Sequence, residues 1–213
     1  MTSDLFEIKK ELVMELRNWD VISISNRGVT TKTDTGTFAA AGTFTPSTSP
    51  TLIKNVRSVT VAAVTLTYGT DYTINHDTGV ITFTAAQTGA YTIIYDYGNT
   101  DSIFPDFPQA NLKLSAFPRI AVDIMGGNRK VIDLGAITDH ATFNLTIVCY
   151  STDVEQLEDM ISSIISNMKS NRKSLYTLKF IGNAVLGPII NSPGSGDKVV
   201  QRNIDFETMF NYE

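Results

Sequence analysis

Two apolar periodicities follow each other in the second half of the chain. Apolar side chains occupy every second position over Phe143–Cys149, which is typical of a strand with one buried face. They then recur every third or fourth position, which indicates an amphipathic helix whose stripe comprises Val154, Leu157, Met160, Ile161, Ile164, Ile165 and Met168. Thr152 and Glu155 have the spacing of a capping box, so we expect the helix to begin at Thr152. Because a one-sided helix must cover apolar surface, it should lie on the sheet that contains the preceding strand.

A second amphipathic helix is predicted at the N-terminus, where Asp4 and Glu7 have the spacing of a helix start. Its apolar side chains are Leu5, Phe6, Ile8, Leu12, Val13, Leu16 and Trp19. We expect its other side to be covered by Lys9, Lys10, Glu11, Glu15 and Arg17. This helix should dock on a core formed by residues much later in the sequence.

The composition changes after Trp19. Thr, Ser, Ala and Gly dominate from Ser23 to Pro50, and Gly42–Pro50 is predicted to be a loop or linker. Short strand-like runs follow at Ser58–Val61, Val64–Tyr68, Asp71–Ile74, Val80–Thr84 and Tyr91–Tyr97. Turn signals every 8–12 residues or so are typical of a small antiparallel sandwich or barrel. We therefore predict an inserted β module over residues 27–98, with its two ends close together.

The remaining strands are predicted at Phe117–Met125, Val131–Ile137, Leu175–Ile181 and Val199–Phe210, with a turn at Gly126–Asn128. The resulting order of helix, strands, helix and strands predicts an α+β fold. In this prediction, residues 1–26 and 99–213 form an antiparallel or mixed sheet packed by two helices. The inserted module is a small all-β, sandwich-like domain.

Composition narrows the classes of function. The chain has 213 residues, of which 42% are hydrophobic and 18% charged, as expected of a folded protein. A net charge of −5 argues against broad nucleic-acid binding. No apolar run approaches the roughly 20 residues of a membrane span, and the charged N-terminal helix does not resemble a signal peptide. A single cysteine, Cys149, excludes disulfide scaffolding and cysteine-rich zinc sites and fits synthesis inside a cell.

We find no pattern that predicts catalysis, a cofactor or a metal. His76 and His140 each lie near an aspartate and could be half of a metal site or an acid/base pair, but both lie in turn-like contexts without a third group, so we interpret them as solvated surface residues. Asp71, Asp77, Asp96 and Asp101 do not have the spacing of a calcium loop and are interpreted as turn caps. Ser23, Ser25 and Cys149 have no neighbouring base, and the segment Pro193–Lys198 lacks the spacing of a phosphate loop.

Three features bear on binding and assembly. Five tyrosines could form a sugar- or protein-binding face or the core of the β module: Tyr68, Tyr72, Tyr91, Tyr95 and Tyr97. The polar side of the second long helix is poor in charge and suits subunit packing, through Ser162, Ser163, Ser166 and Asn167. The long loop Leu186–Lys198 is a candidate assembly loop, particularly at Asn191, Ser192, Pro193, Gly194, Ser195, Gly196, Asp197 and Lys198. We expect protease to cut the free subunit first between Asn191 and Lys198, and assembly to protect this site.

Residues 1–22 and 115–213 together resemble the tail terminator and tail-completion proteins of long-tailed bacteriophages. The elements that carry the resemblance are the N-terminal helix, Phe117–Ile124, the strand–helix unit from Phe143 to Lys169, and Asn203–Phe210. The resemblance implies a non-enzymatic virion protein that is made in the cytoplasm of a bacterial host. It further implies a homo-oligomeric ring, hexameric in this family, that caps the tail tube and meets the head connector or stopper protein.

Two alternatives to a tail terminator remain open. The segment Val64–Thr84 resembles small β modules inserted in phage and bacterial surface proteins. The chain could therefore be a carbohydrate- or surface-binding module that uses the tyrosine-rich insert. It could also be another structural protein of the neck or tail.

Overall fold

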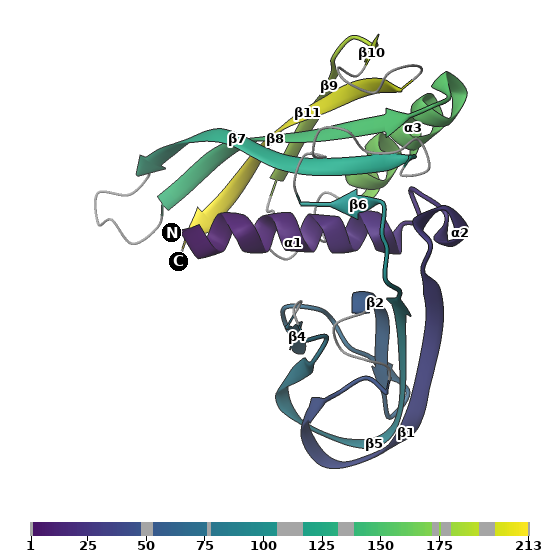
Figure 1. The fold of residues 1–213 in the computed structure, drawn as a ribbon. Coiled ribbons are helices and arrows are strands. Elements are labelled where there is room, and N and C mark those ends of the chain that lie inside the picture. The colour runs from purple at the N-terminus through teal and green to yellow at the C-terminus, as the bar shows by residue number, and fades with distance from the viewer. Residues whose placement is uncertain are drawn as a thin grey trace. The chain divides into compact units, whose positions relative to one another are not determined.

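The computed structural model describes residues 2–47, 53–75, 78–105, 117–131, 139–171, 175, 180–191 and 199–212. The fold is mostly β, with two sheets and few helices, in agreement with the predicted α+β class. The chain divides into two compact units (Figure 1). We call Met1–Ile22 with Ser102–Glu213 the α+β unit, and Ser23–Asp101 the β unit.

The α+β unit contains a six-stranded mixed sheet and two long helices. In chain order its elements are α1 (Thr2–Asn18), β6 (Ile103–Phe104), β7 (Arg119–Val131), β8 (Asp139–Ser151), α3 (Val154–Asn171), β9 (Phe180–Leu186), β10 (Ile190–Asn191) and β11 (Val200–Tyr212). The strand order is β10-β11-β8-β7-β6, and β9 also pairs with β11. All described pairs are antiparallel except β6 with β7.

Both long helices contribute to one core on one face of this sheet. Ile8, Leu12 and Leu16 of α1 and Leu157, Ile161 and Ile164 of α3 belong to the same buried cluster as Ile120, Ile147 and Ile204 of the strands. The alternation predicted for β8 places Leu145, Ile147 and Cys149 in this core, as expected. The prediction left open whether the sheet is antiparallel or mixed; the structure shows a mixed sheet packed by two helices.

Several local predictions for the helices were wrong. Asp153, rather than Thr152, caps α3: its Oδ1 accepts a hydrogen bond of 3.2 Å from the backbone N–H of Glu155. Val154, at the start of the predicted stripe, is 48% exposed because it lies in the first turn, beyond the sheet contact. Glu11, predicted on the outer side of α1, is only 3% exposed.

The strands of the α+β unit are longer than predicted or shifted. Strand β7 runs through Gly126–Asn128, where a turn was expected, and absorbs the glycines in a bulge opposite β8. Strand β9 begins at Phe180 rather than Leu175. The second face of β8, which was expected to be exposed to solvent, is also partly buried. On this face Val148 and Tyr150 form a second small cluster with Ala121 and Val199.

The β unit consists of a short helix and one five-stranded sheet. Its elements are α2 (Ile24–Arg27), β1 (Thr30–Phe44), β2 (Ile53–Val61), β3 (Val64–Thr65), β4 (Tyr72–Ile74) and β5 (Ile81–Tyr97). Strand β5 pairs with β1 on one side and with both β4 and β2 on the other. The strands form one strongly bent sheet around an aromatic core, so the predicted sandwich arrangement is not confirmed (Figure 1).

The largest error in the β unit concerns β1. Its residues are rich in Thr, Ala and Gly, and Gly42–Phe44 was predicted to begin a loop. They form a strand because their backbone pairs with β5 from Thr30 to Phe44, with bulges near Ala41. The two ends of the unit are adjacent, as predicted: Thr30 lies opposite Tyr97, and the Thr100 hydroxyl donates a hydrogen bond of 3.3 Å to the Arg27 carbonyl.

Candidate assembly surface

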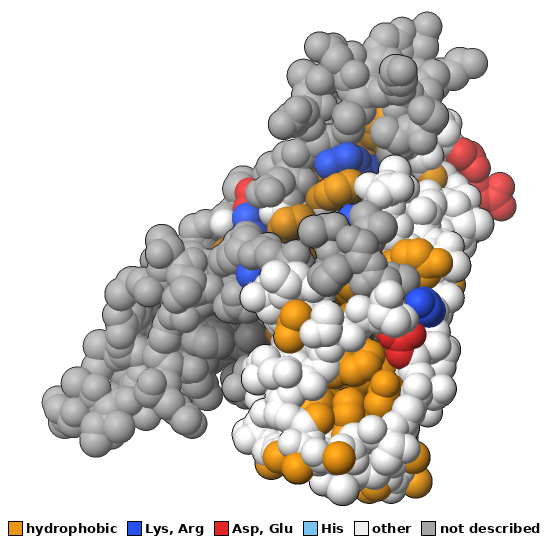
Figure 2. All heavy atoms as spheres, turned by 60° about the horizontal axis from the view of Figure 1, so that its bottom comes forward, with side chains coloured by type: hydrophobic (Ala, Val, Ile, Leu, Met, Phe, Trp, Pro, Cys, Tyr) orange, Lys and Arg blue, Asp and Glu red, His pale blue; other side chains and the backbone are white. Residues whose placement is uncertain are grey.

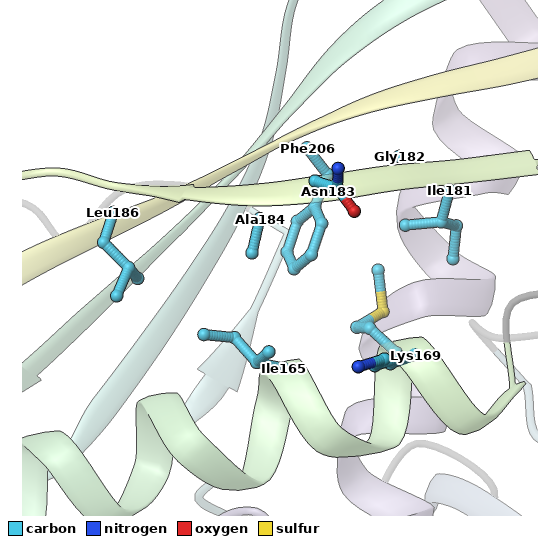
Figure 3. A pocket seen from close by; sticks show the side chains of 9 residues that line it. Ile165, Lys169, Ile181, Gly182, Asn183, Ala184, Leu186 and Phe206 are labelled. Atoms are coloured by element: carbon cyan, nitrogen blue, oxygen red, sulfur yellow. The ribbon is translucent and has the colours of Figure 1, made fainter.

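A groove in the α+β unit lies between α3 and the edge strand β9. We call it the α3–β9 groove; it has a volume of about 270 Å³. Its lining is mainly apolar and consists of Ile165, Met168, Lys169, Ile181, Gly182, Asn183, Ala184, Leu186 and Phe206. Figure 3 shows Ile165 and Lys169 on α3, with the Phe206 ring projecting toward this helix from the strands above it. Of the lining residues that the structure describes, only Lys169 and Asn183 bring side-chain nitrogen or oxygen atoms.

The segment next to the groove, from the end of β9 to β10, exposes apolar side chains. Val185, Leu186, Ile189 and Ile190 are 64%, 41%, 42% and 42% exposed, respectively. These are four of the six large hydrophobic side chains that are exposed in the described part of the chain. We call these four residues the β9–β10 edge. Such a concentration of exposed apolar surface is typical of an interaction site.

The backbone at this edge is also available for contact. Strand β9 pairs with β11 on one side. Within the described residues, no strand pairs with its other side. An apolar edge strand without a partner is prone to associate with another chain. Sequence analysis missed this site, although the run of apolar residues around Gly187 and Pro188, in a segment predicted as a loop, was a visible signal.

The predicted subunit-facing positions lie on the outer side of α3. Ser162 and Ser166 are exposed, whereas Ser163 and Asn167 are half-buried. The Asn167 amide donates a hydrogen bond of 2.9 Å to the Ser163 carbonyl, so these two residues are tied to each other along the helix. The four residues therefore form a polar surface of the helix that adjoins the groove residue Ile165.

The structure describes little of the predicted assembly loop. Asn191 belongs to β10 and lies opposite Val200 of β11, so it is part of the sheet and not of a loop. Ser192, Pro193, Gly194, Ser195, Gly196, Asp197 and Lys198 lie outside the described residues. The loop prediction therefore remains a prediction for these seven positions.

A buried ionic network that joins the two ends of the β unit is the second site that sequence analysis missed. Arg27 is 1% exposed and contacts both Asp96 and Asp101, with Nη1–Oδ2 and Nε–Oδ1 distances of 3.2 and 3.1 Å. Its Nη2 also donates a hydrogen bond of 2.9 Å to Asn55. Arg57 donates a hydrogen bond of 2.7 Å to the other oxygen of Asp96. We call these residues the Arg27 network.

The charges of the Arg27 network compensate one another, which indicates a structural role. Burial acts to raise the pKa of Asp96, but hydrogen bonds from Arg57 and Thr31 and the charges of Arg57 and Arg27 outweigh it, and the pKa is lowered. Asp96 is therefore ionised and neutralised inside the protein. The interpretation of Asp96 as a turn cap was wrong, because the residue lies within β5. Asp71 does act as one, since it accepts a hydrogen bond of 2.7 Å from the Thr67 N–H.

The tyrosines of the β unit belong to its core. Tyr72 and Tyr95 are buried, and Tyr68, Tyr91 and Tyr97 pack against the same cluster. The Tyr91 ring stacks on Phe38 with a centroid distance of 4.1 Å. Figure 2 shows hydrophobic side chains gathered in the lower half of the view, with basic and acidic side chains beside their upper edge. The core interpretation of the tyrosines is confirmed.

The residues considered for chemistry have structural surroundings where they are described. The Ser23 hydroxyl accepts a hydrogen bond from the Asn26 N–H and caps α2. Cys149 is fully buried, which raises the pKa of its thiol. His76 and the side chain of His140 lie outside the description. Across the described ranges, no three His, Cys, Asp or Glu residues form a group that could hold a metal ion.

Two further results concern the chain as a whole. None of the helices in the described part is both long and apolar enough to cross a membrane. In comparisons with known proteins, the chain matches no family model and no curated protein. The assignment of function therefore depends on the geometry above and on the resemblance of the sequence elements.

Proposed function

We propose that this protein is a structural virion protein, a ring-forming tail terminator at the head–tail junction of a long-tailed bacteriophage. Copies of the α+β unit pack side by side in the ring. One face of the ring caps the tail tube, and the other meets the head connector or stopper protein. The proposal involves no catalytic step, cofactor or metal.

The β9–β10 edge is the observation that carries this proposal. It combines four exposed apolar side chains with an edge strand that has no second partner among the described residues. Both features are costly in an isolated subunit and are relieved when another chain covers them. The α+β order of the helices and strands, on which the phage resemblance rests, adds to this support.

The alternative, a carbohydrate- or surface-binding module, depended on a face of exposed tyrosines. Because Tyr72 and Tyr95 are buried and the other three pack beside them, this alternative loses the feature that favoured it. A different structural protein of the neck or tail would use the same edge. Its position in the particle would differ.

The proposal is tested by removing this protein from particle assembly and imaging the products by electron microscopy. We expect filled heads and separate tails that do not join, with joining restored when the purified protein is added back. Complete particles at the normal yield would contradict the proposal. Joined particles with defective tail tips would instead assign the protein to another part of the tail.

A further inference from the structure

We infer that the α3–β9 groove binds the first turn of α3 from a second copy of this chain, an inference that rests on the proposed ring. The inserting element is Val154, flanked by Asp153 and Glu155; we call these three residues the acidic corner. The receiving element is the apolar groove with Lys169 at its rim. Each copy would thus offer a groove to one neighbour and an acidic corner to the other.

The groove suits protein side chains better than a small molecule. Its volume of about 270 Å³ lies below the range of about 300–1,000 Å³ that is usual for small-molecule pockets. Among the described lining residues only Lys169 and Asn183 are polar, which is fewer than the convergent polar groups that usually fix the orientation of a small ligand. An apolar side chain with a carboxylate beside it would match both the apolar lining and Lys169.

The charges of α3 are complementary from one end to the other. Asp153, Glu155 and Asp159 are exposed near its start, and Lys169 is exposed in its last turn. Within the part of the chain that the structure describes, neither Glu155 nor Lys169 has an ion-pair partner. Opposite charges that face each other across an interface fix the register of the two partners. The acidic corner of one copy therefore fits the Lys169 end of another.

Val154 provides the apolar part of the match. It is 48% exposed, and among the described residues of the α+β unit it is the one large hydrophobic side chain exposed outside the β9–β10 edge. Insertion in the groove would remove this side chain from water and cover Leu186 at the same time. Burying a valine side chain contributes favourably in proportion to its apolar area.

The contact has to form between copies. Val154 and Lys169 are separated by 15 helical positions, which corresponds to about 22 Å along α3. One chain therefore cannot place its own acidic corner in its own groove. Because the two surfaces differ, the contact is heterologous, and repetition of a heterologous contact generates a closed ring when the rotation permits.

Charge reversal provides the first test. We would measure the mass of the full-length protein by light scattering at low salt for the wild type, Glu155→Lys, Lys169→Glu and the double variant. Each single change should shift the wild-type ring to the monomer, and the double change should restore the ring because it re-creates the attraction in the opposite sense. Glu207→Lys, which alters an exposed carboxylate on β11, is the matched control and should leave the ring intact.

A cysteine pair provides the second test and does not depend on charge. In Val154→Cys/Leu186→Cys, mild oxidation should produce a ladder of disulfide-linked multimers, since each copy has one thiol for each neighbour. Either single variant should give dimers at most, and native Cys149 is buried. A wild-type ring that survives both charge reversals, or a double-cysteine variant without a ladder, would overturn this interface but leave the proposed function standing. A wild type that is monomeric at every concentration, with and without the tail tube protein, would overturn both.

Discussion

The guanidinium of Arg27 and the carboxylate of Asp96 form an ion pair in which both side chains are completely shielded from solvent. The distance between Nη1 and Oδ2 is 3.2 Å, and the exposed fraction of each side chain is 0%. Arg27 ends α2 at the start of the β unit, whereas Asp96 lies near the end of β5. The pair therefore joins the beginning and the end of the β unit in its interior.

Replacement of Arg27 by methionine should destabilise the β unit by about 3–5 kcal/mol, because it removes the buried cation that contacts both Asp96 and Asp101, while Arg57 continues to pair with Asp96. The effect should be visible as faster amide hydrogen exchange along β1 and β5. The control is Lys32→Met, which removes a cation with a 35% exposed side chain, 3.8 Å from Asp34. That partly exposed pair, with a long Nζ–Oδ1 distance, should contribute about 1 kcal/mol or less. Equal exchange in the two variants would show that the Arg27 network does not clamp the unit.

Removal of the β unit should leave the α+β unit folded. Ile22 and Ile103 belong to the core of the α+β unit, so a short Gly/Ser bridge from Ile22 to Ser102 would replace the whole insert. We expect the shortened protein to unfold in one cooperative transition when followed by the fluorescence of Trp19. An insoluble product, or a transition without cooperativity, would mean that the two units share a core.

The phase of α3 predicts a sharp contrast between neighbouring residues. Ile161 is 1% exposed, so Ile161→Ala should cost about 2–5 kcal/mol of unfolding free energy through lost burial and a residual cavity. Ser162 is exposed, and Ser162→Ala should cost less than about 0.5 kcal/mol in the monomer. Chemical denaturation of both variants checks this, and similar midpoints would refute the assigned phase.

Glu15 on α1 should make stability depend on pH. Burial raises the pKa of its carboxyl from 4.5 to about 7, and the nearby charge of Glu11 acts in the same direction. Because the folded protein binds this proton more tightly than the unfolded chain, the stabilisation is complete below about pH 4.5 and is lost as the pH rises through 7.

The variant Glu15→Gln tests this dependence, since glutamine stays neutral. The free energy of unfolding of this variant minus that of the wild type should increase from pH 5 to pH 8. The increase should be on the order of 2 kcal/mol at most, because one pKa unit corresponds to about 1.4 kcal/mol and the site is not fully buried. Urea unfolding at the two pH values measures the difference. The control Glu207→Gln, at an exposed position, should show no such trend. The same lack of a trend in Glu15→Gln would mean that the Glu15 carboxyl is ionised in the folded and the unfolded protein alike, and would contradict this prediction.

The parts of the fold that the sequence predicts are those in which local periodicity and burial agree. The apolar steps from Leu157 to Met168 place α3 correctly, and the alternation around Ile147 places β8. Val154 shows where this agreement ends, because periodicity cannot tell whether a helix extends beyond the sheet that it covers.

Long-range pairing explains what the sequence does not predict. Strand β1 buries Phe38 and Phe44 but exposes many of its Thr and Ala side chains, and it is held by the backbone of β5. The Arg27–Asp96 pair joins residues 69 positions apart, so neither spacing nor composition indicates it. The α3–β9 groove likewise combines Ile165 and Leu186, which come together only when β9 has paired with β11.

The most direct test of the central claim is the mass of the purified protein in solution, measured by native mass spectrometry alone and with the tail tube protein. We predict one closed ring whose mass is a fixed multiple of the 23.3 kDa chain, six-fold if the family resemblance holds, and this ring should bind the end of the tube. A protein that remains monomeric at all concentrations, with and without the tube protein, would contradict the account.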